Sequence, residues 1–188
     1  MLYFRHGRTL VSAENRLQGR SDHSLDEVGR RQSIEIAQAL QNIDRVISSP
    51  LLRAMETAAA FNRKIKPRFF ELDYGDFDGV LQSDIPEEVW KNWRSDINYC
   101  PPNDESLSEL NHRVRHALDE IIDESRDQNI VVVSHVLPIK AAIAWAVGVD
   151  VSSSWQMLLD RGPISRIEVS LTGPKLRGFN DTPHLLEL

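Results

Sequence analysis

The chain has 188 residues, enough for one domain with a substantial hydrophobic core, because domains usually span roughly 100–200 residues. Its 41% hydrophobic and 27% charged residues form an ordinary globular composition, which excludes a wholly disordered chain. The net charge of −6 argues against nucleic acid or an anionic membrane as a partner, since both require a basic surface, and no apolar run approaches the ~20 residues of a membrane span.

The single cysteine, Cys100, excludes an internal disulfide and a thiolate zinc cluster. It fits a reducing compartment, so a cytoplasmic protein is expected. A cleaved leader is not expected, because its removal would take Arg5 and His6, two residues of special interest, with it. We find no repeat or domain boundary and predict a single domain over residues 1–188. The sequence leaves the oligomeric state open.

The first half of the chain alternates between predicted strands and helices. The predicted strands are, in chain order, Leu2–Arg5, Arg45–Ser48 and Lys66–Phe70. A helix is expected over 25–42, because a capping box begins at Ser24. A second helix is expected over 50–61, with Ser49 as its N-cap and Pro50 at its first position.

A polar middle section follows. Residues Glu71–Ser83 have no clear periodicity and are predicted to form a loop, Asp84–Arg94 is predicted as a helix, and the following segment to Asp104 reads as loop again. Residues 80–105 therefore predict a short insert that could fold over the edge of the sheet like a lid.

The last part of the chain holds the clearest elements. A capping box at Ser106 begins an amphipathic helix, and Ile130–Val133 is an unbroken β-branched run, typical of a strand buried on both faces of a parallel sheet. A helix is predicted over 138–147, ending at Gly148, and a closing hairpin over Ile164–Leu171 and Lys175–Phe179. This alternation predicts an α/β fold: a three-layer sandwich whose mostly parallel sheet carries helices on both faces.

Reactive residues follow the predicted strands. Arg5 and His6 end the first strand, His135 follows the strongest strand, and Arg53 lies one turn into the helix after the second. Glu71 follows the third predicted strand. Since ligands of such sheets bind outside the carboxyl ends of strands, we expect these five side chains to converge at one edge.

The five side chains suit phosphoryl chemistry. Two guanidinium groups match the oxygens of a phosphoryl group, and a neutral imidazole can attack phosphorus to form a phosphohistidine. A carboxylic acid can protonate the leaving oxygen and later activate water. The arginines and second histidine supply the positive charge that a metal ion would otherwise bring, so neither metal nor cofactor is expected. The first twenty residues support an anion site, with four arginines against one acid, Glu14.

Five blocks of sequence, in collinear order over nearly the whole chain, together resemble the histidine phosphatase superfamily, also called phosphoglycerate mutase-like. The blocks are Arg5-His6-Gly7-Arg8-Thr9 with Arg16-Leu17-Gln18-Gly19 and Gly29-Arg30-Arg31-Gln32; Ser48–Ala54 with Glu56-Thr57-Ala58; Glu71–Gly79; Glu105-Ser106 with Arg113-Val114; and Val132-Val133-Ser134-His135. The segment Gly178–Leu185 and the acidic block at Glu71 look similar to the α-ribazole phosphatase branch.

The resemblance implies a role for each residue of the cluster. His6 would be the phosphorylated nucleophile, and Glu71 the general acid and base. Arg5, Arg53 and His135 would bind the phosphoryl oxygens, His135 being counted with the catalytic residues as well.

The same resemblance places Gln18 and Gly19 near the substrate. This sequence departs from the family at the third substrate-proximal position, where Ser12 stands in place of a common asparagine. Arg8 replaces a common glutamate, and Val136 replaces the usual glycine after the second histidine. These departures bear on the shape of the substrate.

The favoured interpretation is a metal-independent phosphatase that acts on a small phosphorylated metabolite, with α-ribazole 5′-phosphate as the specific candidate. Family mutases that use a bisphosphate cofactor generally carry a longer insert, and the insert here is short and acidic, which suits hydrolysis. The alternatives are phosphoglycerate mutase-type transfer, a non-catalytic phosphate-binding module, and a metal-dependent phosphohydrolase. His112 and His116 have the spacing of a metal pair, but they lack a third ligand nearby and fit a solvated helix face.

Overall fold

The computed structural model describes residues 1–40, 42–59, 61, 63–100, 103–124 and 127–184. The strands in these ranges are β1 (Leu2–Arg5), β2 (Arg45–Ser48), β3 (Arg63–Ile65), β4 (Ile130–Ser134), β5 (Ile164–Ser170) and β6 (Gly173–Asp181). The helices are α1 (Leu10–Ala13), α2 (Glu27–Ala39), α3 (Leu52–Thr57), α4 (Glu87–Ser95), α5 (Leu107–Glu124) and α6 (Val136–Val147). Short 3₁₀ turns are η1 (Pro67–Phe69), η2 (Gly75–Phe77), η3 (Gln82–Asp84) and η4 (Val151–Gln156).

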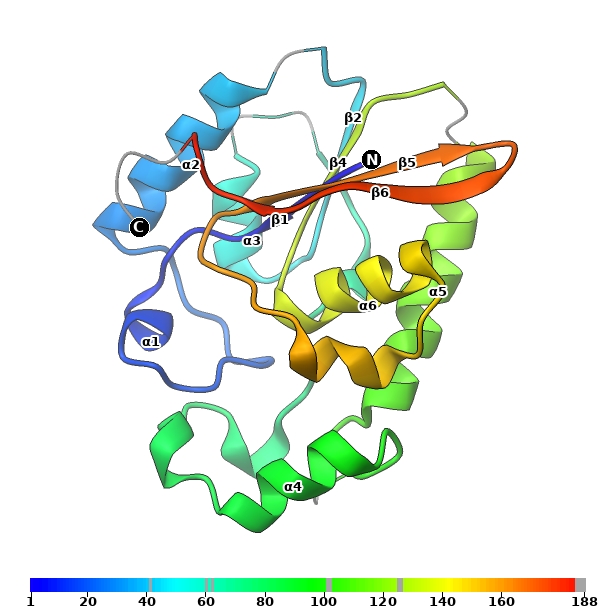
Figure 1. Cartoon of the computed structure of the whole chain (residues 1–188). Helices are drawn as coiled ribbons and strands as arrows, with labels where there is room; N and C mark the ends of the chain where they lie inside the picture. The colour runs from blue at the N-terminus through cyan, green and yellow to red at the C-terminus, as the bar shows by residue number, and fades with distance from the viewer. Residues whose placement is uncertain (41, 60, 62, 101–102, 125–126, 185–188) are drawn as a thin grey trace.

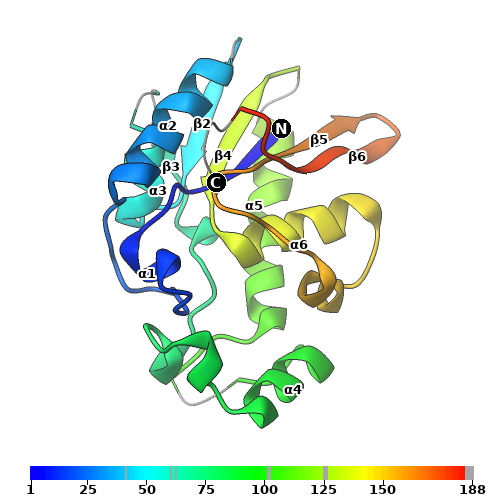
Figure 2. The ribbon, with the colours of Figure 1, turned by 60° about the vertical axis from the view of Figure 1, so that its left-hand side comes forward.

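The strands form a sheet in the order β3-β2-β4-β1-β5-β6. The first four in that order pair in parallel, whereas β5 and β6 are antiparallel, so the sheet is mostly parallel as predicted. Figure 2 shows α2 and α3 on one face and α5 and α6 on the other. The buried strand β4 alternates between the two cores: Val131 and Val133 pack with the α2–α3 side, and Ile130 and Val132 with the α5–α6 side.

The pairing of β1 and β2 with the central strand β4 brings distant residues to one edge. The backbone N–H of His6 donates to Ser134 at 3.0 Å, and that of Ser49 donates to Val133 at 2.9 Å. His135 comes directly after β4 at the same edge. Because all three strands run in the same direction, their carboxyl ends place His6, Ser49 and His135 side by side.

The start of α2 differs from the prediction. Its N-cap is Asp26, whose carboxylate accepts a hydrogen bond from Gly29 N at 2.8 Å, so Ser24 does not cap it. The N–H of Leu25 is instead taken by Glu56 Oε2 at 2.7 Å, which keeps this residue outside the helix. The helix ends at Ala39, and the predicted extension to residue 42 crosses residue 41, which lies outside the described residues.

The start of α3 was also predicted wrongly. Its N-cap is Leu51 rather than Ser49, and no side chain caps it. The hydroxyl of Ser49 lies 2.8 Å from the ring of His135, so the site uses this group. The helix ends at Thr57, short of Phe61; residue 60, within the predicted helix, lies outside the described residues.

The predicted strand Lys66–Phe70 is wrong as well. The third strand is Arg63–Ile65, and Pro67 begins a 3₁₀ turn instead, because proline has no N–H for a sheet and a fixed φ. Glu71 therefore follows η1 rather than a strand. The elements α1 and η4 were not predicted, since each is too short to show a helical period.

The other predicted elements are present, some with shifted ends. The helix predicted over Asp84–Arg94 is α4, which begins at Glu87 because Asp84 belongs to η3. The capping box at Ser106 is formed with Glu109, and Gly148 ends α6 in the left-handed conformation, with φ of 73°. The closing hairpin is present as β5 and β6. The helix α6 begins at Val136, two residues before the predicted Pro138.

The segment 80–105 lies at the bottom of Figure 1, below the sheet, and holds α4. Two backbone hydrogen bonds tie its first residues to the loop after α1: Leu17 N donates to Val80 O at 2.9 Å, and Gln82 N donates to Asn15 O at 3.0 Å. Trp93 anchors the segment in the core with 1% exposure, and Pro101 and Pro102 lie outside the described residues. Whether the segment moves as a lid stays a prediction, as does the single-domain boundary.

Candidate active site

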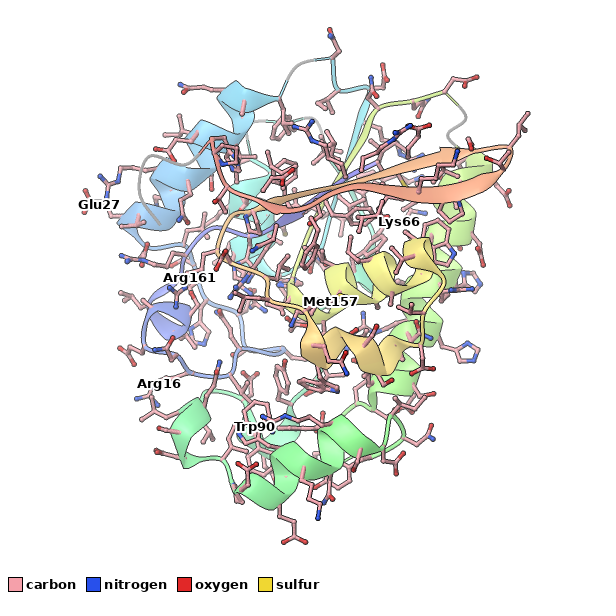
Figure 3. All side chains as sticks on the ribbon, viewed as in Figure 1. Arg16, Glu27, Lys66, Trp90, Met157 and Arg161 are labelled. Carbon is pink, nitrogen blue, oxygen red and sulfur yellow. The ribbon has the colours of Figure 1, made fainter. Side chains whose placement is uncertain are left out.

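A cavity of about 480 Å³ opens at the edge of the sheet where β1 and β4 end. Its wall comes from α1 and the loop after it, the insert, the first turns of α6 and the loop after η4. Figure 3 labels three of its lining residues, Arg16, Trp90 and Arg161. His6 lines this cavity together with Arg5 and Glu71.

The structure brings together the five residues that the strand ends predicted. Arg53 and His135 are both fully buried and lie against His6, which connects them to the cavity. The ring centroids of the two histidines are 5.1 Å apart. Arg5 lies close enough to Glu71 and Arg53 for their charges to affect its pKa.

The ring of His6 is held in one tautomer. Its Nδ1 lies 2.8 Å from the carbonyl oxygen of Gly7, which only accepts, so Nδ1 carries the hydrogen and Nε2 keeps its lone pair. Nε2 accepts a hydrogen bond from Arg53 Nε at 3.3 Å. Burial, followed by the charges of Arg53 and Arg5, holds the pKa of His6 well below its usual value. The imidazole is therefore neutral at neutral pH, and the lone pair of Nε2 is available for attack on an electrophile.

His135 is placed as a hydrogen-bond donor. Its Nε2 lies 2.8 Å from the hydroxyl oxygen of Ser49, whereas its Nδ1 is buried with no hydrogen-bond partner among the described residues. Burial, together with the charge of Arg53, also holds its pKa well below the usual value, so this ring is neutral. When the Ser49 hydroxyl donates to Nε2, Nδ1 carries the proton and is free to donate a hydrogen bond.

The guanidinium group of Arg5 is fixed by the loop after η4. Its Nη1 donates to the carbonyl oxygens of Leu159 and Asp160 at 2.8 and 3.0 Å, while its Nε is buried without a partner among the described residues. Burial lowers the pKa of Arg5 to about 10, which still leaves it charged at neutral pH. It therefore presents a free N–H and a positive charge next to His6.

Arg53 is fixed by the loop before α2. Its Nη1 donates to Ser21 O at 2.9 Å, and its Nη2 donates to Gly19 O at 2.7 Å. Burial lowers the pKa of Arg53 to about 10, so it too stays charged. The only contact of Nε is with the lone pair of His6, among the described residues.

Glu71 is buried at the start of α6. Its Oε1 accepts hydrogen bonds from Leu72 N at 2.8 Å and Leu137 N at 3.2 Å, and its Oε2 accepts one from Val136 N at 2.9 Å. These bonds and the nearby arginines favour the charged form, but burial outweighs them and raises the pKa of Glu71. A carboxyl group with a raised pKa retains its proton at a higher pH and can act as a proton donor.

The three residues expected near the substrate differ in position. Ser12 and Gln18 line the cavity, whereas Gly19 is not among its lining residues. The hydroxyl of Ser12 is already bonded to Thr9 in a capping box, and Gln18 has a buried Nε2 without a partner among the described residues. Gly19 acts through its backbone, whose carbonyl binds Arg53.

The sequence analysis missed several residues that support or line the site. Ser49 was interpreted only as a helix cap, and no periodic pattern marked Lys140 or Arg161, which both line the cavity. Arg113 was noted only as part of a resemblance. Its Nη2 donates to Glu71 O at 3.0 Å, which fixes the backbone of the acid.

The histidine pair predicted on a solvated face lies there. His112 and His116 are exposed on α5, and no group of three or more His, Cys, Asp or Glu side chains in the described ranges is placed to hold a metal ion. In the same ranges, no helix is both long and apolar enough to cross a bilayer.

Comparisons with known proteins agree with this architecture. Phosphoserine phosphatase 1 of Hydrogenobacter thermophilus is 31% identical over 199 residues, which cover 100% of this chain and 94% of that protein. A bifunctional protein of Mycobacterium tuberculosis is 32% identical over 198 residues, covering 98% of this chain but 54% of the relative, so the chain spans about half of that protein. A probable phosphoglycerate mutase of Yersinia pestis is 30% identical over 200 residues, with 96% and 92% covered.

Solved structures show the same fold. Phosphoserine phosphatase of Entamoeba histolytica in complex with 3-phosphoglyceric acid superposes with a TM-score of 0.87, 27% identity and 98% of both chains covered. A putative alpha-ribazole-5′-P phosphatase of Escherichia coli gives a TM-score of 0.84, 25% identity and 96% of both chains covered. Residues 1–182 match the family described as the histidine phosphatase superfamily, branch 1. The chain therefore belongs to the histidine phosphatase superfamily.

Proposed function

We propose that this protein is a phosphoric monoester hydrolase that acts through a phosphohistidine on His6. Nε2 of His6 attacks phosphorus, the bond between phosphorus and the ester oxygen breaks, and Glu71 gives its proton to the leaving oxygen. Water then attacks the phosphohistidine while the Glu71 carboxylate takes a proton from it. The P–N bond breaks, and its electrons return to Nε2, which restores the enzyme and releases phosphate.

The observation that carries this proposal is the state of the His6 ring. Gly7 fixes its Nδ1 proton at 2.8 Å, and burial between two arginines keeps Nε2 unprotonated. Arg5 and Arg53 bring positive charge beside it, and the ring of His135 lies against it, so the site can stabilise the charge that develops on the phosphoryl oxygens. The two arginines supply the positive charge that a metal ion would supply, so the proposed reaction needs none.

Hydrolysis is proposed over transfer because of the insert. Its described residues from Val80 to Asp104 carry the acids Asp84, Glu87, Glu88, Asp96 and Asp104 against the bases Lys91 and Arg94. Of these described residues, those that line the cavity are the uncharged Gln82 and Trp90, so the insert adds no cation that would retain an anionic intermediate. Mutase-type transfer is the second candidate, favoured by the likeness to a probable phosphoglycerate mutase. Among substrates, α-ribazole 5′-phosphate and phosphoserine are the candidates suggested by the names of similar proteins. A non-catalytic phosphate-binding module is disfavoured by the intact nucleophile and acid.

The proposal predicts hydrolysis of p-nitrophenyl phosphate in the presence of excess EDTA. Phosphate release is measured on purified protein with and without chelator, and with 3-phosphoglycerate assayed separately for conversion to 2-phosphoglycerate. Equal rates with and without EDTA support the metal-independent reaction. Loss of activity in EDTA that returns with added metal would contradict it, and isomerisation without phosphate release would favour the mutase.

Glu71→Gln tests the general acid. We expect kcat/KM to fall by about 10²-fold or more for an alkyl phosphate, because its alkoxide needs a proton, and by less than about 10-fold for p-nitrophenyl phosphate, whose leaving group does not. The comparison uses kcat/KM because this parameter excludes the later hydrolysis of the phosphoenzyme. Glu168→Gln, the same change on exposed β5, is the control.

The pH profile gives a second measure of Glu71. For the alkyl phosphate, activity should fall on the acid side as the depressed pKa of His6 is crossed and on the basic side as the raised pKa of Glu71 is crossed, because the active form pairs a neutral imidazole with a protonated acid. The Gln variant should lose the basic limb after correction for the ionisation of the substrate near pH 6. An equal loss on both esters with an unchanged profile would remove this role.

A further inference from the structure

The cavity contains more positive charge than one phosphoryl group uses. Arg5 and Arg53 flank His6 and are the partners of the transferred group. Three other cationic side chains also line the cavity. Arg16 is paired with Glu14, whereas Lys140 on α6 and Arg161 on the loop after η4 have no ion-pair partner among the described residues. Uncompensated cations in a partly closed space attract a second negative group.

Lys140 is the less expected of the two. Its side chain is 9% exposed, and it makes no hydrogen bond or ion pair with any part of the chain that the structure describes. Burial lowers the pKa of its ammonium group to about 8, opposed by the charge of Glu71, so at neutral pH it remains mostly protonated. Because Lys140 lines the cavity, its ammonium group is open to a negatively charged partner from outside the protein, and such a pair is stronger in a partly buried site than in bulk water.

Arg161 provides a second, independent observation that the cavity can bind a further negatively charged group. One nitrogen, Nη2, is used to hold α1 and its loop, donating to Ser12 O at 2.6 Å and Asn15 Oδ1 at 3.3 Å. Its Nε is buried with no partner among the described residues. Figure 3 shows Arg161 beside α1. Arg161 lines the cavity, and its charge is close enough to lower the pKa of Arg5.

The two acids that line the cavity, Glu71 and Asp160, form no ion pair with Lys140 or Arg161 among the described residues. Glu71 is bonded to three backbone N–H groups and has a raised pKa, so it is the proton donor of the proposed reaction. Asp160 Oδ2 is held by Asn180 Nδ2 at 2.8 Å. The rest of the wall includes Trp90 and Trp155, which suit a short carbon skeleton.

We propose that Lys140, with Arg161 beside it, forms a subsite for a second anionic group, a carboxylate or a second phosphate, on a small phosphomonoester. This inference rests on the proposed hydrolase function and narrows its substrate class. The cavity of about 480 Å³ limits the substrate to a small molecule. A phosphorylated carboxylic acid or a small bisphosphate is therefore preferred over an ester whose remainder is uncharged.

Matched substrates test this subsite. 3-Phosphoglycerate and glycerol 3-phosphate differ only in whether the end carbon is a carboxylate or an alcohol, and propane-1,3-diol bisphosphate against its monophosphate makes the same comparison for a second phosphate. We expect at least one charged ester to have a kcat/KM about 10-fold or more above that of its uncharged partner. The pair that shows the preference identifies the anionic group, and p-nitrophenyl phosphate measures the basal reaction.

Lys140→Met should remove the preference, chiefly by raising KM for the charged ester, with the uncharged ester changed less than about 3-fold. Lys140→Arg keeps the charge and should retain most of the preference. Lys175→Met, the same change on exposed β6, should leave all substrates unaffected.

Three results would overturn the inference. If p-nitrophenyl phosphate is hydrolysed but neither matched pair shows a preference, the subsite is absent while the hydrolase function stands. If Lys140→Met lowers kcat/KM equally for charged and uncharged esters, with a shifted pH profile, Lys140 positions or tunes Glu71 instead of binding substrate. If no ester is hydrolysed, the hydrolase function itself fails, and this inference fails with it.

Discussion

His6→Ala is expected to lower kcat/KM for p-nitrophenyl phosphate by about 10⁴-fold or more, the scale of loss seen when a covalent nucleophile is removed. The reason is geometric. Nε2 of His6 is the unprotonated nitrogen in the cavity, fixed by Gly7 and surrounded by Arg5 and Arg53. Without it, no group in the described site replaces the covalent step, because His135 is fully buried and its Nε2 is already hydrogen-bonded to Ser49.

A phosphoenzyme measurement makes this prediction specific. Protein mixed with ³²P-labelled substrate and quenched in denaturant at alkaline pH should carry label that is lost on acidification, as expected for a phosphohistidine, and His6→Ala should carry none. His112→Ala, on the exposed face of α5, is the control and should match the wild type. A melting temperature for each variant separates loss of chemistry from loss of fold. Full activity in His6→Ala would refute the mechanism.

The part of the site that the sequence predicted is the part that strand ends determine. Ile130–Val133 is apolar on both faces, so its place at the centre of a parallel sheet followed from composition, and His135 comes directly after it. The first strand is nearly as clear, and its parallel pairing with β4 places His6 beside His135. Adjacent parallel strands convert residues that are 129 positions apart into neighbours.

The starts of α2 and α3 depend on side-chain hydrogen bonds that the sequence pattern did not predict correctly. Serine is a residue type that favours N-caps, but the hydroxyl of Ser49 is hydrogen-bonded to the ring of His135 instead. This contact can form only after β2 and β4 pair. At α2, Asp26 forms the N-cap in place of the capping box predicted at Ser24. At α2 a second polar side chain forms the cap, whereas at α3 no side chain does, so the local pattern alone did not determine either helix start.

Lys140 and Arg161 escaped prediction for a different reason. Lys140 is the only charged residue of α6, whose other residues are mostly buried, so helical periodicity gives no polar face that would set it apart. Arg161 lies in an irregular segment between η4 and β5, where no sequence period applies. Their shared position in the cavity depends on how α6 and this segment pack around Arg5, which is a property of the assembled fold.

Arg53→Ala is expected to reduce kcat/KM by about 100-fold, on the order of 3 kcal/mol, by analogy with the removal of one oxyanion-hole donor. In the free protein Arg53 Nε donates to the lone pair of His6 Nε2 at 3.3 Å. That lone pair becomes the P–N bond, so the same N–H is released to a phosphoryl oxygen as the bond forms. An interaction gained during the reaction lowers kcat more than it raises KM when it is removed.

Two variants separate this effect from damage to the loop that Arg53 holds. Arg53→Lys keeps a charge but loses the forked donors, and should retain activity between that of Arg53→Ala and the wild type. Asp78→Asn weakens the same loop, because Asp78 accepts hydrogen bonds from the backbone N–H groups of Gly19 and Ser21, without altering Arg53 itself. Steady-state kinetics and melting temperatures are measured for all three variants. A direct contact with the transferred phosphoryl group is expected to act chiefly on kcat. If kcat/KM falls by less than about tenfold in Arg53→Ala, or falls equally in Asp78→Asn, then Arg53 supports the loop and not the phosphoryl group.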